Sequence, residues 1–126
     1  MNNLNFLCEQ FAKILNGKSN INQGVCSVSL RRNIKVFVQG RPSTSVIPVG
    51  ISFESLDQNG NALNLGEIAI LQEEIPLFMQ SIVQQGIIVS ALHNHIQSVE
   101  PPLSFAKKLA NSFSVLSSYP ITDNGS

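Results

Sequence analysis

Apolar residues in this chain recur at two different periods, and that change of period constrains the fold more than any other feature. Over residues 3–16 they recur every three to four positions, which is typical of one face of an amphipathic helix, and Gly17 provides a stop. From residue 25 to about residue 71 they mostly alternate with polar residues, which is typical of half-buried strands. The chain is therefore expected to place one helix before a sheet.

The alternating region predicts four strands. Residues 25–30 and 34–39 are expected to form a β-hairpin, with Arg31–Asn33 as the tight connection between them. Asn59-Gly60 accepts positive φ readily and predicts a second turn. The other expected segments are loops over 18–24 and 40–48, a third strand from Val49 and a fourth strand over 61–71.

The following segment has the pattern of a βαβ unit. A helix that begins near Glu73 and ends at Gly86 separates the fourth strand from a β-branched strand over 87–95, so these two strands should lie side by side and parallel. A last helix is expected over about 102–116. The order predicts an α+β two-layer sandwich, in which helices cover one face of a mixed sheet. We expect a single domain over 1–116 and a flexible tail over 117–126.

Composition excludes several classes of function. The chain has 126 residues, with 8 basic and 8 acidic side chains, 43% hydrophobic residues and 13% charged residues. This suits one folded domain and gives no electrostatic footprint for nucleic acid or a membrane surface. No membrane span and no signal peptide is recognisable, so a cytoplasmic protein is expected. Cys8 and Cys26 lack metal spacing and are expected to be buried and reduced, with a disulfide or a reactive thiol as alternatives.

His93 and His95 are the first candidates for chemistry. Residues two apart in a strand share a face, so the two imidazoles should project together and could bind one metal ion, such as zinc. They end the expected strand, and ligands gather beyond the carboxyl ends of parallel strands. The alternative is that both are hydrogen-bonded or solvent-exposed residues at the margin of the core, because zinc needs a third and usually a fourth ligand.

Glu67 is the candidate partner for these histidines. It interrupts an otherwise apolar stripe in the fourth strand, and a carboxylate there is costly unless it is paired. If the strands over 61–71 and 87–95 are parallel neighbours, Glu67 should stand near Ala91 or His93, where it could orient an imidazole, bind a metal or act as a general base. The alternative places Glu67 in solvent on an edge strand.

The other charged residues suggest simpler roles. Glu73 and Glu74 are expected to serve the helix dipole and solubility. Arg31, Arg32 and Arg41 are expected to be loop or hairpin-end charges.

The run from Gly66-Glu67 through Gly86 to Ala91-Leu92-His93-Asn94-His95 resembles the LppY/LpqO-type bacterial domain of unknown function. The earlier hairpin fits as well, and the resemblance covers roughly residues 10–116. It implies the α+β fold without an activity. In that family the His-Asn-His end is followed by a loop and another strand with a third His, whereas here His95 runs directly into Ile96. Relative to that family, about a dozen residues are absent after His95. The gap is either a natural deletion or a segment missing from the sequence. We favour a missing segment, because residues 96–99 resemble the end of the next strand.

Three functions remain open. The first is a small binding module with a His/Glu pocket, formed by His93, His95 and Glu67, for a metal ion or a small polar ligand. The second is a metal-assisted hydrolase-like enzyme that uses the same residues. The third is a structural module that forms a homo-oligomer, because few charges and a half-covered sheet favour burial of apolar surface between copies.

Overall fold

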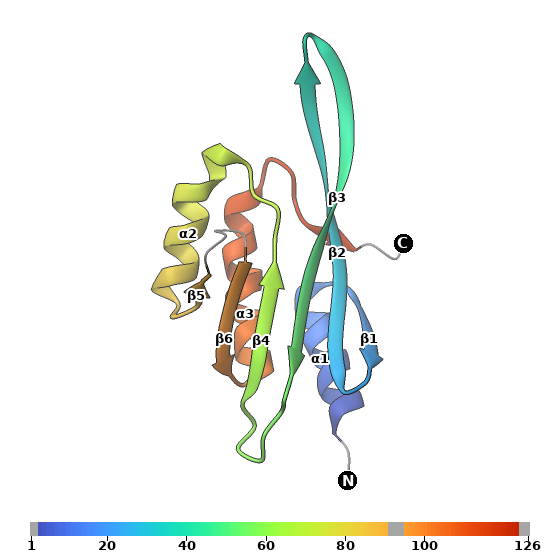
Figure 1. Cartoon of the computed structure of the whole chain (residues 1–126), viewed down its shortest axis with the longest axis vertical. Helices are drawn as coiled ribbons and strands as arrows, with labels where there is room; N and C mark the ends of the chain where they lie inside the picture. Colours follow the sequence, from blue (N-terminus) through green and yellow to red (C-terminus); the bar gives the residue numbers. More distant parts are fainter. Residues whose placement is uncertain (1–2, 91–94, 124–126) are drawn as a thin grey trace.

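A computed structural model describes residues 3–90 and 95–123 and shows two layers. A seven-stranded sheet has the order β1-β2-β3-β4-β6-β5, and β7 pairs with the middle of β2, at Leu30 and Arg31. Helices α1 and α3 cover one face of this sheet, and α2 packs against α3 and β5 (Figure 1). The α+β two-layer prediction is confirmed.

The helices are α1 (Leu4–Leu15), α2 (Ile75–Gln84) and α3 (Pro102–Phe113), with 3-10 turns η1 (Gln72–Glu74) and η2 (Ser114–Leu116). The strands are β1 (Lys18–Asn22), β2 (Val25–Val38), β3 (Arg41–Glu54), β4 (Ala62–Glu67), β5 (Ile88–Val89), β6 (His95–Glu100) and β7 (Thr122–Asp123).

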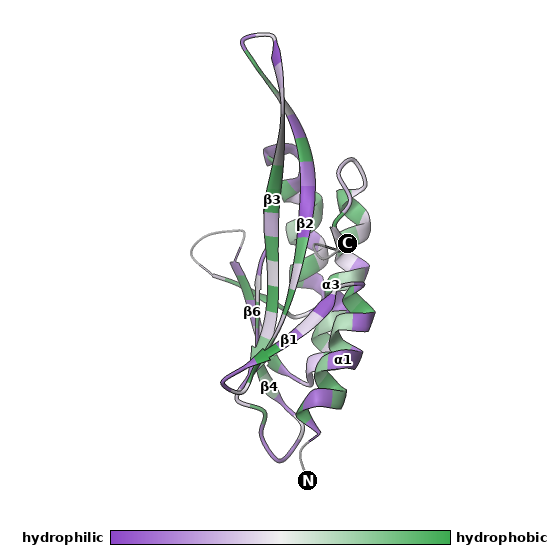
Figure 2. Ribbon diagram, turned by 90° about the vertical axis from the view of Figure 1, so that its right-hand side faces the viewer, coloured by the Kyte–Doolittle hydropathy of each residue, from purple (hydrophilic) through white to green (hydrophobic). Residues whose placement is uncertain are grey.

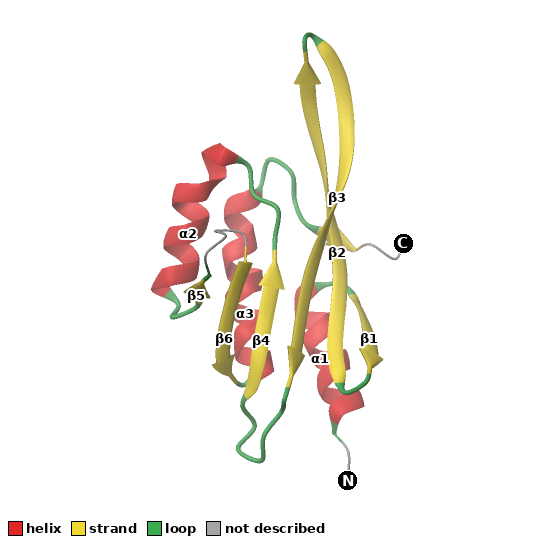
Figure 3. Cartoon of the chain, in the orientation of Figure 1, coloured by secondary structure: helices red, strands yellow, loops and turns green. Residues whose placement is uncertain are grey.

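The prediction of a hairpin turn at Arg31–Asn33 is wrong. Arg31–Asn33 lies inside β2, which runs unbroken for 14 residues and pairs along its length with β3 (Figure 3). The turns fall instead at Gln23-Gly24 and Gln39-Gly40, where all four residues have positive φ. This is the conformation that two-residue hairpin loops require, and glycine adopts it readily. The two expected loops over 18–24 and 40–48 are consequently mostly strand, in β1 and β3.

The core lies between the sheet and the helices. Alternate residues of the strands point toward α1 and α3, as the alternating pattern predicts. Phe11 of α1 meets Phe53 of β3 edge to face, with ring centroids 4.9 Å apart. The largest fully buried apolar side chains come from both layers: Phe11, Phe53, Phe78, Phe105, Leu30, Ile51, Ile68, Ile82, Ile96, Leu109 and Leu116.

The βαβ unit is present in a split form. β4 and β5 are both antiparallel to β6, which lies between them, so they run parallel to each other without being neighbours. The predicted side-by-side pairing of parallel strands is therefore wrong, and every strand pairing in the described part of the chain is antiparallel. The single strand expected over 87–95 is also divided. His95 begins β6, so the expectation that 96–99 belongs to a following strand is confirmed.

The segment after α3 contacts the sheet. Thr122 and Asp123 pair with Arg31 and Leu30, and the carbonyl of Tyr119 accepts a hydrogen bond from Arg32. The expected tail over 117–126 thus has contacts with the domain through residue 123. No helix in the described ranges is long and apolar enough to span a membrane.

Candidate functional site

The face of the sheet that is turned away from α1 and α3 carries the predicted site residues. We call it the open face. In a strand, side chains alternate between faces, so Glu67 lies on the face opposite to its buried neighbours Gly66 and Ile68. His95 lies opposite to buried Ile96 in the same way. Both candidates therefore project from the open face, outside the core.

Strand register brings Glu67 and His95 together. They are direct partners across the antiparallel β4–β6 pair, and His95 Nε2 lies 3.3 Å from Glu67 Oε2. The expected neighbours of Glu67, Ala91 and His93, lie outside the described residues, and the structure pairs Glu67 with His95 through an antiparallel register. His93, the other predicted ligand, is among these residues outside the described ranges. Ser90 fixes the start of β6, because its backbone N–H and its hydroxyl both donate to the carbonyl of His95.

The Glu67–His95 pair borders a groove of about 420 Å³ on the open face. The same cross-strand row continues from Glu67 to Gly50 and then to Ser29. A Cβ added at Gly50 would meet no atom within 4 Å, so the groove is open directly beside the carboxylate. Ser27 and Ser52 pair in the adjacent row and extend this floor of small residues.

This pair adds little to the stability of the fold. The side chains of Glu67 and His95 are 65% and 40% exposed. Ion pairs at exposed positions contribute about 0–1 kcal/mol, because solvent screens the charges and both side chains lose rotamer freedom. The carboxylate and imidazole therefore keep polar atoms for a ligand in the groove.

The expected apolar face of the fourth strand is reversed. The stripe that includes Leu63, Leu65 and Glu67 faces the open side, while Ala62, Asn64 and Gly66 face the helices. The amide nitrogen of the buried Asn64 donates to the carbonyls of Ala62, Ser98 and Glu100, whereas its Oδ1 has no partner among the described residues. β4 also lies between β3 and β6, so Glu67 is exposed without being on an edge strand.

The residues that sequence reasoning missed are the small ones in the floor of the groove. Ser27, Ser29, Gly50 and Ser52 occupy polar positions of the alternating pattern, where they look like ordinary surface residues. The only sequence feature that marks these residues is that small side chains occupy every second position in parts of β2 and β3. The strand register is needed to know that the small residues of the two strands lie next to each other.

A metal centre is not complete in the described residues. No group of three or more His, Cys, Asp or Glu side chains lies together anywhere in 3–90 and 95–123. Glu67 and His95 are two donors, whereas zinc takes three or four ligands from the protein.

Comparison with known families gives a match across this whole architecture. A family model described as Domain of Unknown Function (DUF1259) matches residues 9–112, which extend from α1 into α3 and include Glu67 and His95. The chain belongs to this family. Comparisons of the chain with curated proteins and with solved structures both found no match.

A buried ion pair stands apart from the groove of this DUF1259 domain. Arg32 is fully buried on the helix side of β2, where Nη1 and Nη2 bind the two carboxylate oxygens of Glu74 at 2.9 and 2.8 Å. Nη1 also donates to the carbonyl of Ala69, and Nε donates to that of Tyr119. The predictions that Arg32 is a hairpin-end charge and that Glu74 serves only the helix dipole are therefore wrong, because the pair joins β2 to η1.

Burial and pairing oppose each other at Glu74. Burial alone would raise its pKa, but hydrogen bonds from Arg32 and from the N–H of Leu71, together with the charge of Arg32, lower the pKa below its ordinary value. The carboxylate is therefore ionised at neutral pH, and the bidentate pair is intact.

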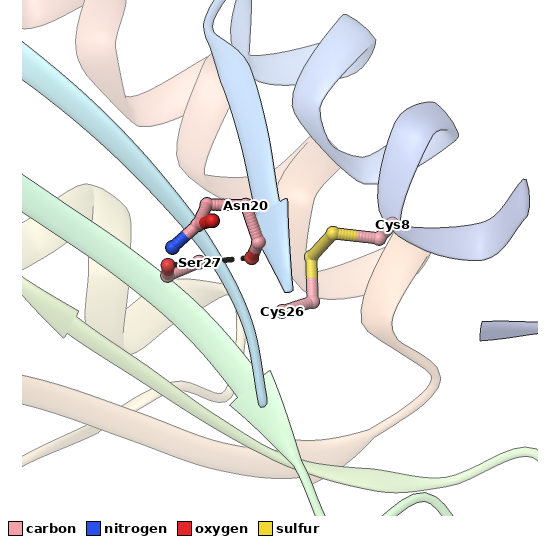
Figure 4. The surroundings of a disulfide bond; sticks show 4 residues. All are labelled: Cys8, Asn20, Cys26 and Ser27. Atoms are coloured by element: carbon pink, nitrogen blue, oxygen red, sulfur yellow. Dashed lines mark hydrogen bonds between the residues drawn. A yellow bond between two sulfur atoms is a disulfide. The ribbon is translucent and has the colours of Figure 1, made fainter. Parts of the chain in front are cut away.

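Cys8 and Cys26 form a disulfide, with their Cα atoms 5.6 Å apart (Figure 4). Both are fully buried, as expected, but the prediction that they are reduced is wrong. The alternation of β2 turns Cys26 toward α1, and the apolar stripe of α1 turns Cys8 toward the sheet. Packing of these two faces brings together sulfurs whose spacing in sequence gave no indication of a bond.

Proposed function

We propose that this DUF1259 domain is a binding module that holds a small polar ligand in the groove of the open face. The observation that carries the proposal is the Glu67–His95 pair, 3.3 Å apart, beside the open space at Gly50. A volume of about 420 Å³ lies within the range of small-molecule sites.

The chemistry of the groove favours a polyhydroxylated ligand. The carboxylate of Glu67 accepts hydrogen bonds, and the ring nitrogens of His95 add hydrogen-bonding positions beside it. Hydroxyls at Ser27, Ser29 and Ser52 can either donate or accept. Such mixed polarity matches a small molecule whose several O–H groups are both donors and acceptors, such as a monosaccharide or a cyclitol.

Amide chemical shifts of the ¹⁵N-labelled chain test this proposal. The probes are a set of monosaccharides, inositol and zinc chloride, each titrated separately. We expect at least one polyol to shift the amides of Ser29, Gly50 and Glu67, and we expect Gly50→Leu to abolish these shifts because it fills the groove. Ser43→Leu is the matched control, since Ser43 is an exposed small residue of the same strand.

Two outcomes would overturn the proposal of a polar ligand. One is the absence of a localised shift with every polyol, or shifts that persist in Gly50→Leu. The other is stoichiometric zinc binding that is lost in His95→Ala, which would make the site a metal centre. We infer that the chain is of the LppY/LpqO type within its family. If the site is a metal centre, that assignment implies a further His ligand.

The disulfide supports a location in an oxidising compartment. Disulfides persist in exported and periplasmic proteins and are rare in the reducing cytosol. Cys8–Cys26 joins the two layers of the core. We therefore favour an oxidising compartment over the cytoplasm that the sequence predicts.

A second candidate function is self-association through the open face. Val99 and Ile88 are 74% and 58% exposed, beside the half-buried Leu63 and Leu65. Burial of such apolar area would favour a homodimer. Sedimentation equilibrium tests this candidate, because Val99→Ser should weaken a dimer, and a monomeric chain at all concentrations would exclude it.

A further inference from the structure

The outer parts of β2 and β3 form a two-stranded arm. β4 pairs with β3 only from Gly50 onward, and β7 pairs with β2 only at Leu30 and Arg31. In the strand ladder, residues 33–46 therefore pair only with each other, and Tyr119 donates a hydrogen bond to the carbonyl of Lys35 near their base. This arm projects beyond the rest of the molecule (Figures 1 and 2). An isolated two-stranded ribbon has little stability of its own, so its length calls for a role other than support of the core.

The tip of the arm is apolar on both faces. Phe37 is 72% exposed and Val38 is 63% exposed, and they precede the turn at Gln39-Gly40. Consecutive strand residues point to opposite faces, so these two side chains project on opposite sides of the ribbon. A partner that packs on one side would cover only one of them. A lipid layer into which the tip inserts would cover both side chains.

The arm has basic side chains and no acidic ones. Between Val25 and Phe53 the chain has four basic residues and no Asp or Glu. Arg32 is neutralised by Glu74 in the core. Lys35 and Arg41 are both exposed: Lys35 lies two residues before Phe37 on the same face of the ribbon, and Arg41 is the cross-strand partner of Val38 on the other face. The zero net charge of the chain therefore conceals a local concentration of cations at one end of the molecule.

Two prolines disfavour pairing of the arm with another strand. Pro42 lies in the arm opposite Phe37, and Pro48 lies at the base of the arm opposite Arg31. A proline nitrogen cannot donate to the ladder, so it faces the unpaired edge of its strand and removes a donor there. The β3 edge of the arm is consequently a poor template for β-augmentation by a second copy.

We propose that the tip of the arm docks on an anionic lipid surface. Phe37 and Val38 enter the interface between headgroups and acyl chains, while the long side chains of Lys35 and Arg41, one on each face, extend to the lipid phosphates. A second copy of the chain is a less suitable partner, because two cationic arms repel each other. This inference is independent of the groove and its ligand.

The absence of Trp in the chain permits a direct test. In Phe37→Trp, the indole is a single reporter at the tip. We expect its emission to shift to the blue when vesicles of phosphatidylglycerol are added, and we expect quenching by brominated acyl chains. Leu77→Trp is the matched control, because Leu77 is 60% exposed on α2, and its emission should not change.

Charge variants separate the two contributions. Vesicle co-sedimentation should weaken about tenfold or more in Lys35→Ser/Arg41→Ser, given roughly 1 kcal/mol for each cation near an anionic surface. Phosphatidylcholine vesicles should bind the unmodified chain comparably weakly. NaCl at about 1 M should also release the protein, because it shortens the Debye length to ~3 Å.

Several results would overturn the proposal. No blue shift at Phe37→Trp with anionic vesicles would exclude insertion of the tip. Binding that Phe37→Ser/Val38→Ser leaves unchanged would place the contact elsewhere. A blue shift that rises with protein concentration without lipid would identify a second copy as the partner. All these side chains are exposed, so circular dichroism should show an unchanged fold in each variant.

Discussion

Arg32 illustrates how alternation and residue type can give opposite indications about one position. Its place in the pattern, two residues beyond Leu30, turns it toward the helices, whereas its charge favours solvent. The structure reconciles the two by burying the guanidinium with Glu74 and two carbonyls. Sequence could indicate the direction of the side chain, but the partner is 42 residues away in the chain and only folding brings it there.

Replacement of Arg32 should destabilise the domain strongly. In Arg32→Met the carboxylate of Glu74 keeps its burial cost without its partner, and such losses are about 3–5 kcal/mol. Urea unfolding followed by circular dichroism measures the change. Arg41→Met is the control and should alter the free energy of unfolding by less than about 0.5 kcal/mol, because Arg41 is exposed. Equal stability of the two variants would contradict a structural role for the pair.

Acid should destabilise the domain through two carboxylates. At Glu100, burial would raise the pKa, but hydrogen bonds from Lys108, Ser98 and Ser104 and the charge of Lys108 lower it, and Glu74 is lowered similarly. A pKa that is lower in the folded state means that the unfolded chain binds more protons as pH falls. Stability is therefore full above the ordinary value of 4.5 and declines as pH drops through the folded values.

The Glu74→Gln variant checks the contribution of Glu74 to this decline. It should be less stable at neutral pH, and its stability should depend less on pH between about 5 and 2. Glu73→Gln is the control at the neighbouring exposed position and should keep the full dependence. Identical pH profiles for Glu74→Gln and the unmodified chain would exclude Glu74 as a source of the acid sensitivity.

At the scale of elements, helices were easier to predict than strand boundaries. The helix over 3–16 matches α1, and the last helix matches α3 followed by η2, because long apolar stripes at helical spacing leave little ambiguity. The sequence predicts a break in β2 at Arg31–Asn33 because a run of polar residues resembles a turn. The actual turns depend on positive φ at Gln-Gly pairs, which is a weaker signal in sequence than Asn-Gly.

The disulfide between α1 and β2 should stabilise the domain measurably. It closes a loop with a sequence separation of 18 residues, and loops of this size correspond to about 3 kcal/mol in the chain-entropy account. Thermal unfolding with and without a phosphine reductant should show that loss. The double variant Cys8→Ala/Cys26→Ala should unfold identically in both conditions. An intact mass equal to that of the dithiol, without reductant, would contradict the bond.

At the scale of the whole molecule, the arm and the body should be nearly independent. Residues 37–43 of the tip are exposed and make no contact with the core cluster. Replacing residues 37–42 by Asn-Gly would join Val36 and Ser43, which are already cross-strand partners of the same hydrogen-bonded kind as Val38 and Arg41, through a short hairpin turn. We expect the free energy of unfolding to change by less than about 1 kcal/mol. A larger loss in calorimetry would show that the tip supports the fold.

The sequence by itself determined the α+β class, the helices and the candidates Glu67 and His95. These follow from local periodicity and from the rarity of charged residues on strand faces, both of which act over a few neighbours in the chain. It also indicated that 96–99 belongs to a further strand, as the end of that strand.

Only the tertiary structure decided which residues meet. β6 lies between β4 and β5, so Glu67 faces His95 through an antiparallel register instead of a parallel one. The same packing decided that Arg32 is buried, that Cys8 bonds to Cys26, and that small residues of β2 and β3 form one groove. The physical reason is common to all of them. Pairings between distant segments depend on how whole faces fit together, and periodicity describes each face without naming its partner.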